Sequence, residues 1–189
     1  MSESDAPEEP PQTEGKTWIA AALAFYGLAL VVEWIVLDWR EEFDDLEVAL
    51  LSGHEAGLVP VIGMPCALIG AAFTAACSRR LGKVRAIEEK FAHHCADTSD
   101  VALAMLSVLC AVSEGLVVRF WIFQWQGFLA SVAIAVVMAL GPGVWALWPL
   151  HLGLALLLTG VVEAGLGLLP AMLAHALILY WSLRRILVP

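Results

Sequence analysis

Charged side chains are scarce in this 189-residue sequence, at 15% of the residues, whereas hydrophobic side chains make up 60%. An ordinary soluble domain is about 45–50% apolar, so a chain of this composition cannot bury its apolar surface inside a water-soluble globule. Bilayer-length helices of about 20 residues each would use up most of the chain, which leaves no room for a separate soluble catalytic domain. The composition therefore predicts an all-α protein, a polytopic transmembrane helical bundle with about six spans.

The common catalytic and binding motifs are also missing. The sequence has no His-Glu-x-x-His, no Gly-x-Ser-x-Gly, no phosphate-binding glycine loop and no nucleic-acid signature. We therefore expect no nucleic-acid partner, no cofactor and no bound metal. A polar cluster between two apolar stretches fits no usual zinc spacing: His93, His94, Cys95 and Asp97.

Cysteine is sparse as well, and no Cys-x-x-Cys pair occurs. The four cysteines are Cys66, Cys77, Cys95 and Cys110. Because they lie mostly in or beside apolar segments, they are interpreted as small buried hydrophobes, and a disulfide framework is not expected.

The first 16 residues form an acidic segment that contains Ser, Pro and Glu but no apolar run. Such a composition predicts a disordered tail. A signal peptide is not indicated, because it would need a basic start followed directly by an apolar stretch. Residues 17–189 are then expected to form a single transmembrane helical domain.

Apolar runs of near-bilayer length and the turn residues between them predict the spans. The breaks within the long apolar stretch are placed at residues 124–127, 141–143 and 163–167, where glycine, proline or polar residues interrupt it. The resulting six helices are residues 17–37, 57–77, 101–123, 128–140, 144–162 and 168–183. Residues 38–55 and 78–100 are expected to be polar connections.

Lysine and arginine positions predict the orientation, because they are enriched in cytoplasmic loops. With the first span running outward, most of them fall on the cytoplasmic side: Lys16, Arg79, Arg80, Lys83, Arg85, Lys90, Arg184 and Arg185. Arg40 alone lies outside. We therefore expect an integral protein of the plasma (inner) membrane with both termini cytoplasmic.

Six charged or titratable residues lie inside or at the ends of predicted spans: Glu33, Glu114, Arg119, His151, Glu163 and His175. A charge at bilayer depth costs about 2.5–3.5 kcal/mol, so these side chains are expected to face the bundle interior and to mark function. On an α-helix, Glu114 and Arg119 would point about 140° apart. The sequence therefore predicts that they do not pair, and that Arg119 finds its partner on another helix, at Glu33 or Glu163.

Residues 112–180 resemble the CPBP family of intramembrane proteases, which includes the CAAX-prenyl endopeptidases and abortive-infection-like proteins. The family shows a Glu-Glu-x-x-x-Arg signature, and the run Ser-Glu-Gly-Leu-Val-Val-Arg places Glu114 on its first Glu and Arg119 on its Arg. The run Leu-Pro-Ala-Met-Leu-Ala-His-Ala, which contains Pro170 and His175, is similar to the family's closing segment. The second Glu is replaced by Gly115.

Two further positions depart from the family pattern. Leu179 stands where an Asn or its equivalent is expected, and residues 138–142 lack the middle His. His151 lies about ten residues later than that His. The resemblance implies that Glu114 activates the hydrolytic water, that His175, alone or together with His151, stabilises the oxyanion, and that Arg119 anchors the site.

Three functional hypotheses follow from these residues. The leading one is a divergent glutamic-type endopeptidase that hydrolyses a peptide bond of a membrane-associated protein or peptide, in contact with membrane lipid. An alternative is a catalytically inactive relative that acts as a binding partner or scaffold for a membrane protein. A weaker alternative is a small transporter, in which Glu33, Glu114, Arg119 and Glu163 relay ions or protons. The sequence does not fix an oligomeric state.

Overall fold

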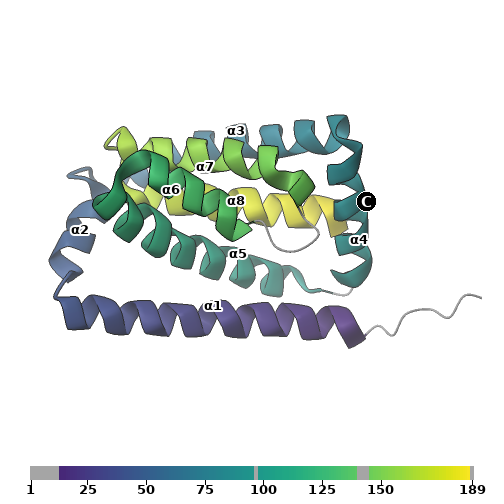
Figure 1. The fold of residues 1–189 in the computed structure, drawn as a ribbon, viewed down its shortest axis with the longest axis horizontal. Helices are drawn as coiled ribbons and strands as arrows, with labels where there is room; N and C mark the ends of the chain where they lie inside the picture. The colour runs from purple at the N-terminus through teal and green to yellow at the C-terminus, as the bar shows by residue number, and fades with distance from the viewer. Residues whose placement is uncertain (1–12, 96–97, 140–144, 188–189) are drawn as a thin grey trace, which may run out of the picture.

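The computed structural model describes residues 13–95, 98–139 and 145–187, and every element in these ranges is a helix (Figure 1). The elements are α1 (Thr13–Arg40), α2 (Phe43–Leu51), α3 (Leu58–Arg80), α4 (Gly82–Cys95), α5 (Asp100–Glu114), the π-helix η1 (Gly115–Ile122), α6 (Phe123–Ala139), the 3-10 helix η2 (Trp145–Leu147), α7 (Trp148–Glu163) and α8 (Leu168–Leu187). The predicted break at residues 141–143, the tail up to residue 12, Asp97 and the side chains of His93, His94 and Cys95 lie outside the described residues.

The long helices lie side by side along one axis, and the short helices α2 and α4 close opposite ends of the bundle (Figure 1). Helix α1 lies along one side and packs mainly on α5, while α8 contacts both α3 and α5. The C-terminal end of α8 lies beside α4. Because α8 packs against helices on two sides, its side chains are the best placed to meet those of other helices.

Four segments are long and apolar enough to cross a membrane: Thr17–Arg40, Leu58–Arg80, Asp100–Ala139 and Trp145–Glu163. They support an integral membrane protein, as the composition predicts. The predicted count of about six spans is not reproduced by this criterion, because α8 is not among the four and residues 100–139 count as one segment.

That 40-residue segment is not one straight helix. Gly127 has a φ of 76°, a conformation that only glycine adopts readily, and beyond it α6 packs against η1. Ser131 Oγ donates a hydrogen bond to the Val118 carbonyl oxygen at 2.8 Å, which ties the two limbs together. The chain thus turns back within residues 124–127, where the sequence predicts a break.

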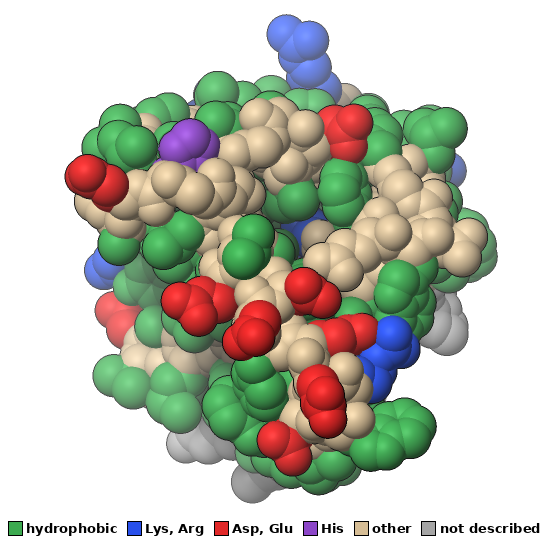
Figure 2. All heavy atoms as spheres, turned by 90° about the vertical axis from the view of Figure 1, so that its left-hand side faces the viewer, with side chains coloured by type: hydrophobic (Ala, Val, Ile, Leu, Met, Phe, Trp, Pro, Cys, Tyr) green, Lys and Arg blue, Asp and Glu red, His purple; other side chains and the backbone are tan. Residues whose placement is uncertain are grey.

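The two predicted polar connections are partly helical. Residues 38–55 contain α2 and residues 78–100 contain α4. Helix α1 also begins at Thr13, so residues 13–16 of the predicted tail are helical. All three stretches lie at the ends of the bundle (Figure 1), and there α2 packs Phe43, Leu46 and Leu50 against the core while its acidic side chains face outward (Figure 2).

The α3 surface that faces α8 is made of small side chains. The buried residues of α3 are Gly63, Ala67, Gly70 and Thr74, spaced three or four positions apart along one face. Small residues in this spacing let two helices approach closely, as is common between membrane helices. This packing fixes α8, and with it the position of His175, against the rest of the bundle.

The two ends of the bundle carry opposite charge. Figure 2 looks onto the end at which α2 lies, and acidic side chains gather on this face. The residues of α2 and its flanks supply them: Glu41, Glu42, Asp44, Asp45, Glu47 and Glu55. We call this the acidic end. The opposite end holds the basic termini of α3 and α8, together with α4.

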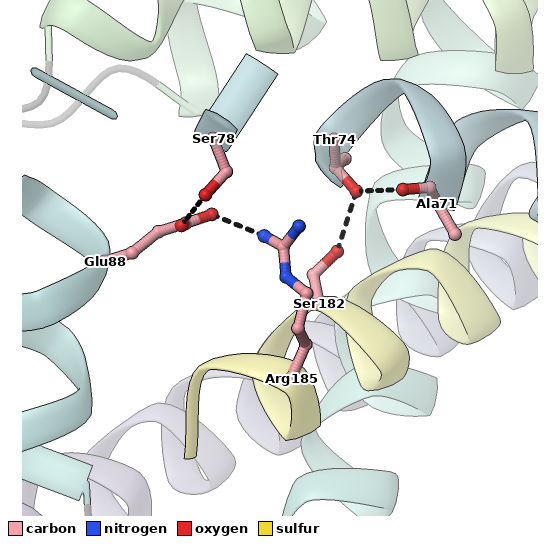
Figure 3. Close-up of polar contacts among 6 residues, drawn as sticks. All are labelled: Ala71, Thr74, Ser78, Glu88, Ser182 and Arg185. Carbon is pink, nitrogen blue, oxygen red and sulfur yellow. Dashed lines mark hydrogen bonds and ion pairs between the residues drawn. The ribbon is translucent and has the colours of Figure 1, made fainter. Parts of the chain in front are cut away.

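A polar network joins α3, α4 and α8 at this basic end (Figure 3). Glu88 of α4 accepts hydrogen bonds from Ser78 Oγ and, at 2.7 Å, from Arg185 Nη2. One turn deeper, Thr74 Oγ1 donates to the Ala71 carbonyl oxygen and lies 3.3 Å from Ser182 Oγ. Glu88 is therefore the link that holds α4 across the ends of the other two helices.

Candidate functional site

The site is centred on Glu114, the last residue of α5, at the point where the helix changes from α to π winding. Arg119 Nη2 donates a hydrogen bond to Glu114 Oε1 at 2.8 Å, and only 1% of the Arg119 side chain is exposed. The prediction that these residues cannot pair was wrong, and so was the expectation of a partner on another helix. A π-helix makes its hydrogen bonds between residues five apart, so positions 114 and 119 lie one turn apart and meet on the same face.

Helix α8 brings His175 to the other oxygen of the same carboxylate. His175 Nε2 lies 3.6 Å from Glu114 Oε2, and the two side chains are 12% and 20% exposed. This separation is longer than a direct hydrogen bond and is one at which a bridging water can lie. The Glu114 carboxylate is thus held on one side by a guanidinium and faces an imidazole on the other.

Cys110 is a member of this group that the sequence interpretation missed. A ligating atom of each of Cys110, Glu114 and His175 lies within 4.8 Å of the others, and the side chain of Tyr26 from α1 is hydrogen-bonded to that of Cys110. A signal was available, because Cys110 precedes Glu114 by four positions and such residues share one face of an α-helix. Tyr26 carried no comparable signal.

Two other predicted site residues lie at different distances from this group. His151 of α7 is within electrostatic range of both Glu114 and His175, although no hydrogen bond joins it to either in the described part of the chain. Glu163 is exposed at the end of α7. Of the candidates, Glu114, Arg119 and His175 are in contact distance, His151 is near, and Glu163 is apart.

Glu33 forms a separate buried contact next to the site. Ser113 Oγ donates a hydrogen bond to Glu33 Oε1 at 2.5 Å, and both residues are almost fully buried between α1 and α5. Because Ser113 and Glu114 are neighbours on one helix, their side chains leave it in directions about 100° apart. Glu33 therefore ties α1 to the helix that carries Glu114, and it is not the partner of Arg119.

Gly115 allows the close approach of α8 to this helix. A Cβ atom added at Gly115 would collide with the side chain of Met172, which is itself buried in a core cluster with Leu116 and Phe120. The position that carries a second Glu in the CPBP signature thus has no room for a side chain here. This helix therefore contributes one acid to the site, Glu114, and the next residue, Gly115, packs against the apolar side chain of Met172.

Several buried polar atoms of the site and of its neighbour Glu33 have no hydrogen-bond partner among the described residues: Arg119 Nε and Nη1, His175 Nδ1 and Glu33 Oε2. Buried polar groups are nearly always hydrogen-bonded, to protein or to ordered water. Arg119 therefore retains donors, and His175 a ring nitrogen, that can bind water or a ligand after their contacts with Glu114 are made.

The site lies in the half of the bundle nearer the acidic end. His175 is seven residues from the start of α8, which is about 10 Å along the helix axis, and α8 begins at the end where α2 lies (Figure 1). Near that end, Trp121 Nε1 of η1 donates a hydrogen bond to Glu42 Oε2 at 2.7 Å. The catalytic candidates are thus buried below the acidic face and away from the basic one.

No protein-family model, curated protein or solved structure matches this chain. Any likeness to a known family therefore depends on the motif residues and on the geometry of the site.

Proposed function

We propose that this protein is a glutamic-type intramembrane endopeptidase, a divergent relative of the CPBP proteases, that hydrolyses a peptide bond of a membrane-associated substrate. The observation that carries the proposal is the 3.6 Å separation of Glu114 Oε2 and His175 Nε2, with Glu114 Oε1 bonded to Arg119. A partly exposed carboxylate that is fixed on one side and faces an imidazole can hold one water molecule for attack.

The chemistry uses one carboxylate and one imidazole. Glu114 takes a proton from the water as its oxygen bonds to the substrate carbonyl carbon, and the carbonyl oxygen becomes an oxyanion. The Nε2–H of neutral His175 donates a hydrogen bond to that oxyanion. Glu114 then gives the proton to the leaving nitrogen, the carbon–nitrogen bond breaks, and a carboxylic acid and an amine are released.

Arg119 positions the base. Its hydrogen bond to Oε1 leaves Oε2 directed toward His175, and its positive charge balances the negative charge of the Glu114 carboxylate. His151 interacts electrostatically with Glu114 and would supply a second polar group for the substrate. These roles match those that the family resemblance implies for the same residues.

We further propose that six helical passes cross the inner membrane and that the basic end faces the cytoplasm. The turn at Gly127 and the length of α8 support six passes, and the charges at the two ends support the orientation, because arginine and lysine favour the cytoplasmic side. In this arrangement the Glu114 site lies in the outer half of the bilayer. The cleaved bond would then be near the outer surface of the membrane.

A Glu114→Gln variant tests the mechanism. Its carboxamide can still accept the hydrogen bond from Arg119 but cannot take a proton from water, so cleavage of co-expressed single-span reporter proteins should stop. Glu163→Gln is the matched control, because Glu163 is an exposed acid at the end of a neighbouring helix, and it should cleave normally. Normal cleavage by a folded Glu114→Gln protein would refute the mechanism.

One observation favours a second candidate function, a catalytically inactive scaffold that binds a membrane protein. The second acid of the family signature is absent, because Gly115 stands at its position. A side chain there would collide with Met172, so the acid cannot be restored without repacking. A scaffold would retain a co-purifying partner in both the wild type and Glu114→Gln, and neither would cleave any reporter.

A further inference from the structure

A group of three metal-ligating side chains surrounds the proposed catalytic carboxylate. Cys110 and Glu114 come from one face of α5 and His175 from α8, and one ligating atom of each lies within 4.8 Å of the other two. Thiolate, carboxylate and imidazole are the three ligand types that zinc takes in proteins. We infer that Cys110, Glu114 and His175 bind a thiophilic divalent cation such as Zn²⁺, and that the bound ion inhibits hydrolysis by occupying the base.

The spacing of the donors fits a small tetrahedral ion. Zinc–ligand distances of about 2.0–2.3 Å place two tetrahedral ligands about 3.3–3.8 Å apart. Glu114 Oε2 and His175 Nε2 are 3.6 Å apart, within this range. The remaining donor pairs lie within 4.8 Å and need to close by about 1.5 Å at most to reach these ligand separations, which rotations about the side-chain bonds of Cys110 and Glu114 can provide.

The neighbours of the three ligands suit them for this role. Ligating groups in metal sites are usually held by a second layer of hydrogen bonds. Arg119 holds the other oxygen of Glu114 at 2.8 Å, and Tyr26 is hydrogen-bonded to Cys110. Two of the three ligands are thus oriented by a partner that does not itself compete for the ion.

The same ligands explain why the ion would inhibit. An ion bound to Glu114 Oε2 takes the lone pair that must accept the proton of the hydrolytic water, and it draws His175 Nε2 away from the oxyanion. Three protein ligands leave a fourth position that water can fill, and the Glu114 and His175 side chains are 20% and 12% exposed. This regulatory step rests on the proposed function, whereas binding of the ion does not.

Metal binding by the purified full-length protein in detergent tests the inference directly. Zn²⁺ affinity is measured by competition with a chromophoric chelator, and Co²⁺ is used as a probe because a cobalt–thiolate bond gives an intense near-ultraviolet band. The wild type should bind one equivalent and show the band. Cys110→Ser should lose the band and weaken Zn²⁺ binding by about 100-fold, at least the effect of losing an outer-layer partner.

Cys77→Ser is the matched control, because Cys77 is a free, partly buried cysteine near the C-terminal end of α3, at the basic end of the bundle. This variant should bind Zn²⁺ and Co²⁺ like the wild type. A thermal unfolding curve for each variant shows that the serine change leaves the fold intact. Zn²⁺ affinity that is unchanged in a folded Cys110→Ser protein, or a Co²⁺ complex without the thiolate band, would overturn the site.

Hydrolysis is assayed separately, so that the two proposals can fail independently. Zn²⁺ should slow reporter cleavage by the wild type, and the same concentration should have at least tenfold less effect on Cys110→Ser relative to its own metal-free rate. Cleavage by the wild type that Zn²⁺ leaves unchanged would refute the inhibition. Metal binding by a protein that cleaves no reporter would support the site and refute the protease.

Discussion

Arg119 reaches back five residues along its own helix to donate a hydrogen bond to Glu114 at 2.8 Å. The contact exists because residues 115–122 are wound as a π-helix, in which positions five apart are stacked. Such windings are rare and often occur at functional sites. Because of this winding, the buried guanidinium of Arg119 is paired with the partly exposed carboxylate of Glu114.

Removal of this ion pair should be costly. Arg119→Met leaves Glu114 without its ion-pair partner, and the loss of one member of a buried pair typically destabilises a protein by about 3–5 kcal/mol. We expect the unfolding transition in detergent to fall accordingly and reporter cleavage to be lost. Arg119→Lys keeps the charge and should recover part of the stability; if Arg119→Met is as stable as the wild type, the pair does not support the fold.

The π winding itself can be tested by moving the arginine one position. The double variant Val118→Arg/Arg119→Val places the arginine four residues after Glu114, the favourable spacing on an α-helix. In the π-helix, position 118 instead packs against Val132, Ala135 and Ala155, so the variant should be strongly destabilised. Wild-type stability of this double variant would show that the segment is α-helical.

The sequence predicted the long helices well and the site only partly. Apolar length placed the helices that became α1, α3 and α8, and glycines marked the turns near Gly127 and Gly165. These signals are local, since each depends only on composition over about 20 residues. The two end helices α2 and α4 were missed because, at nine and 14 residues, they are too short for a criterion based on about 20 apolar residues.

The contacts of the site depend on structure that no local pattern encodes. The geometry of α-helices correctly placed Glu114 and His175 on separate helices but gave the wrong angle for Arg119, because nothing in the residues Gly115–Ile122 distinguishes π from α winding. Cys110 was interpreted as a core residue since its neighbours His175 and Tyr26 come from other helices. Whether three side chains meet is decided by how α1, α5 and α8 pack.

The close contact between Gly115 and Met172 can be tested by a destabilising substitution at one residue and a compensating substitution at the other. Gly115→Ala adds a Cβ that collides with Met172, and overpacking of this kind costs about 1–3 kcal/mol. The unfolding midpoint should therefore fall, and the double variant Gly115→Ala/Met172→Ala should lose less than the two single changes together. Gly160→Ala is the control, because its Cβ would meet nothing within 4 Å; equal effects at both glycines would contradict the packing argument.

The contact between Glu33 and Ser113 should serve the fold and not the reaction. Glu33→Gln keeps an oxygen that accepts the Ser113 hydroxyl, so stability should change by no more than about 1 kcal/mol and reporter cleavage should persist. Ser113→Ala leaves the buried Glu33 without that donor and should cost about 1–3 kcal/mol. Cleavage lost in a stable Glu33→Gln protein would instead place Glu33 among the reacting groups.

The number of passes and their direction can be read from reporter fusions. If six helices cross with the basic end in the cytoplasm, alkaline phosphatase should be active when fused after Gly53, Gln126 or Gly165, and a fluorescent protein should be fluorescent when fused after Lys90 or Pro189.

The fusion after Gly165 distinguishes best between six crossings and four. In the alternative of four crossings, residues 100–139 make a single pass and α8 does not cross. Gly165 would then lie in the cytoplasm, and the phosphatase fused after it would be inactive. An active Gly165 fusion together with a fluorescent C-terminal fusion requires α8 to span the membrane, and it places the Glu114 site about 10 Å below the outer surface.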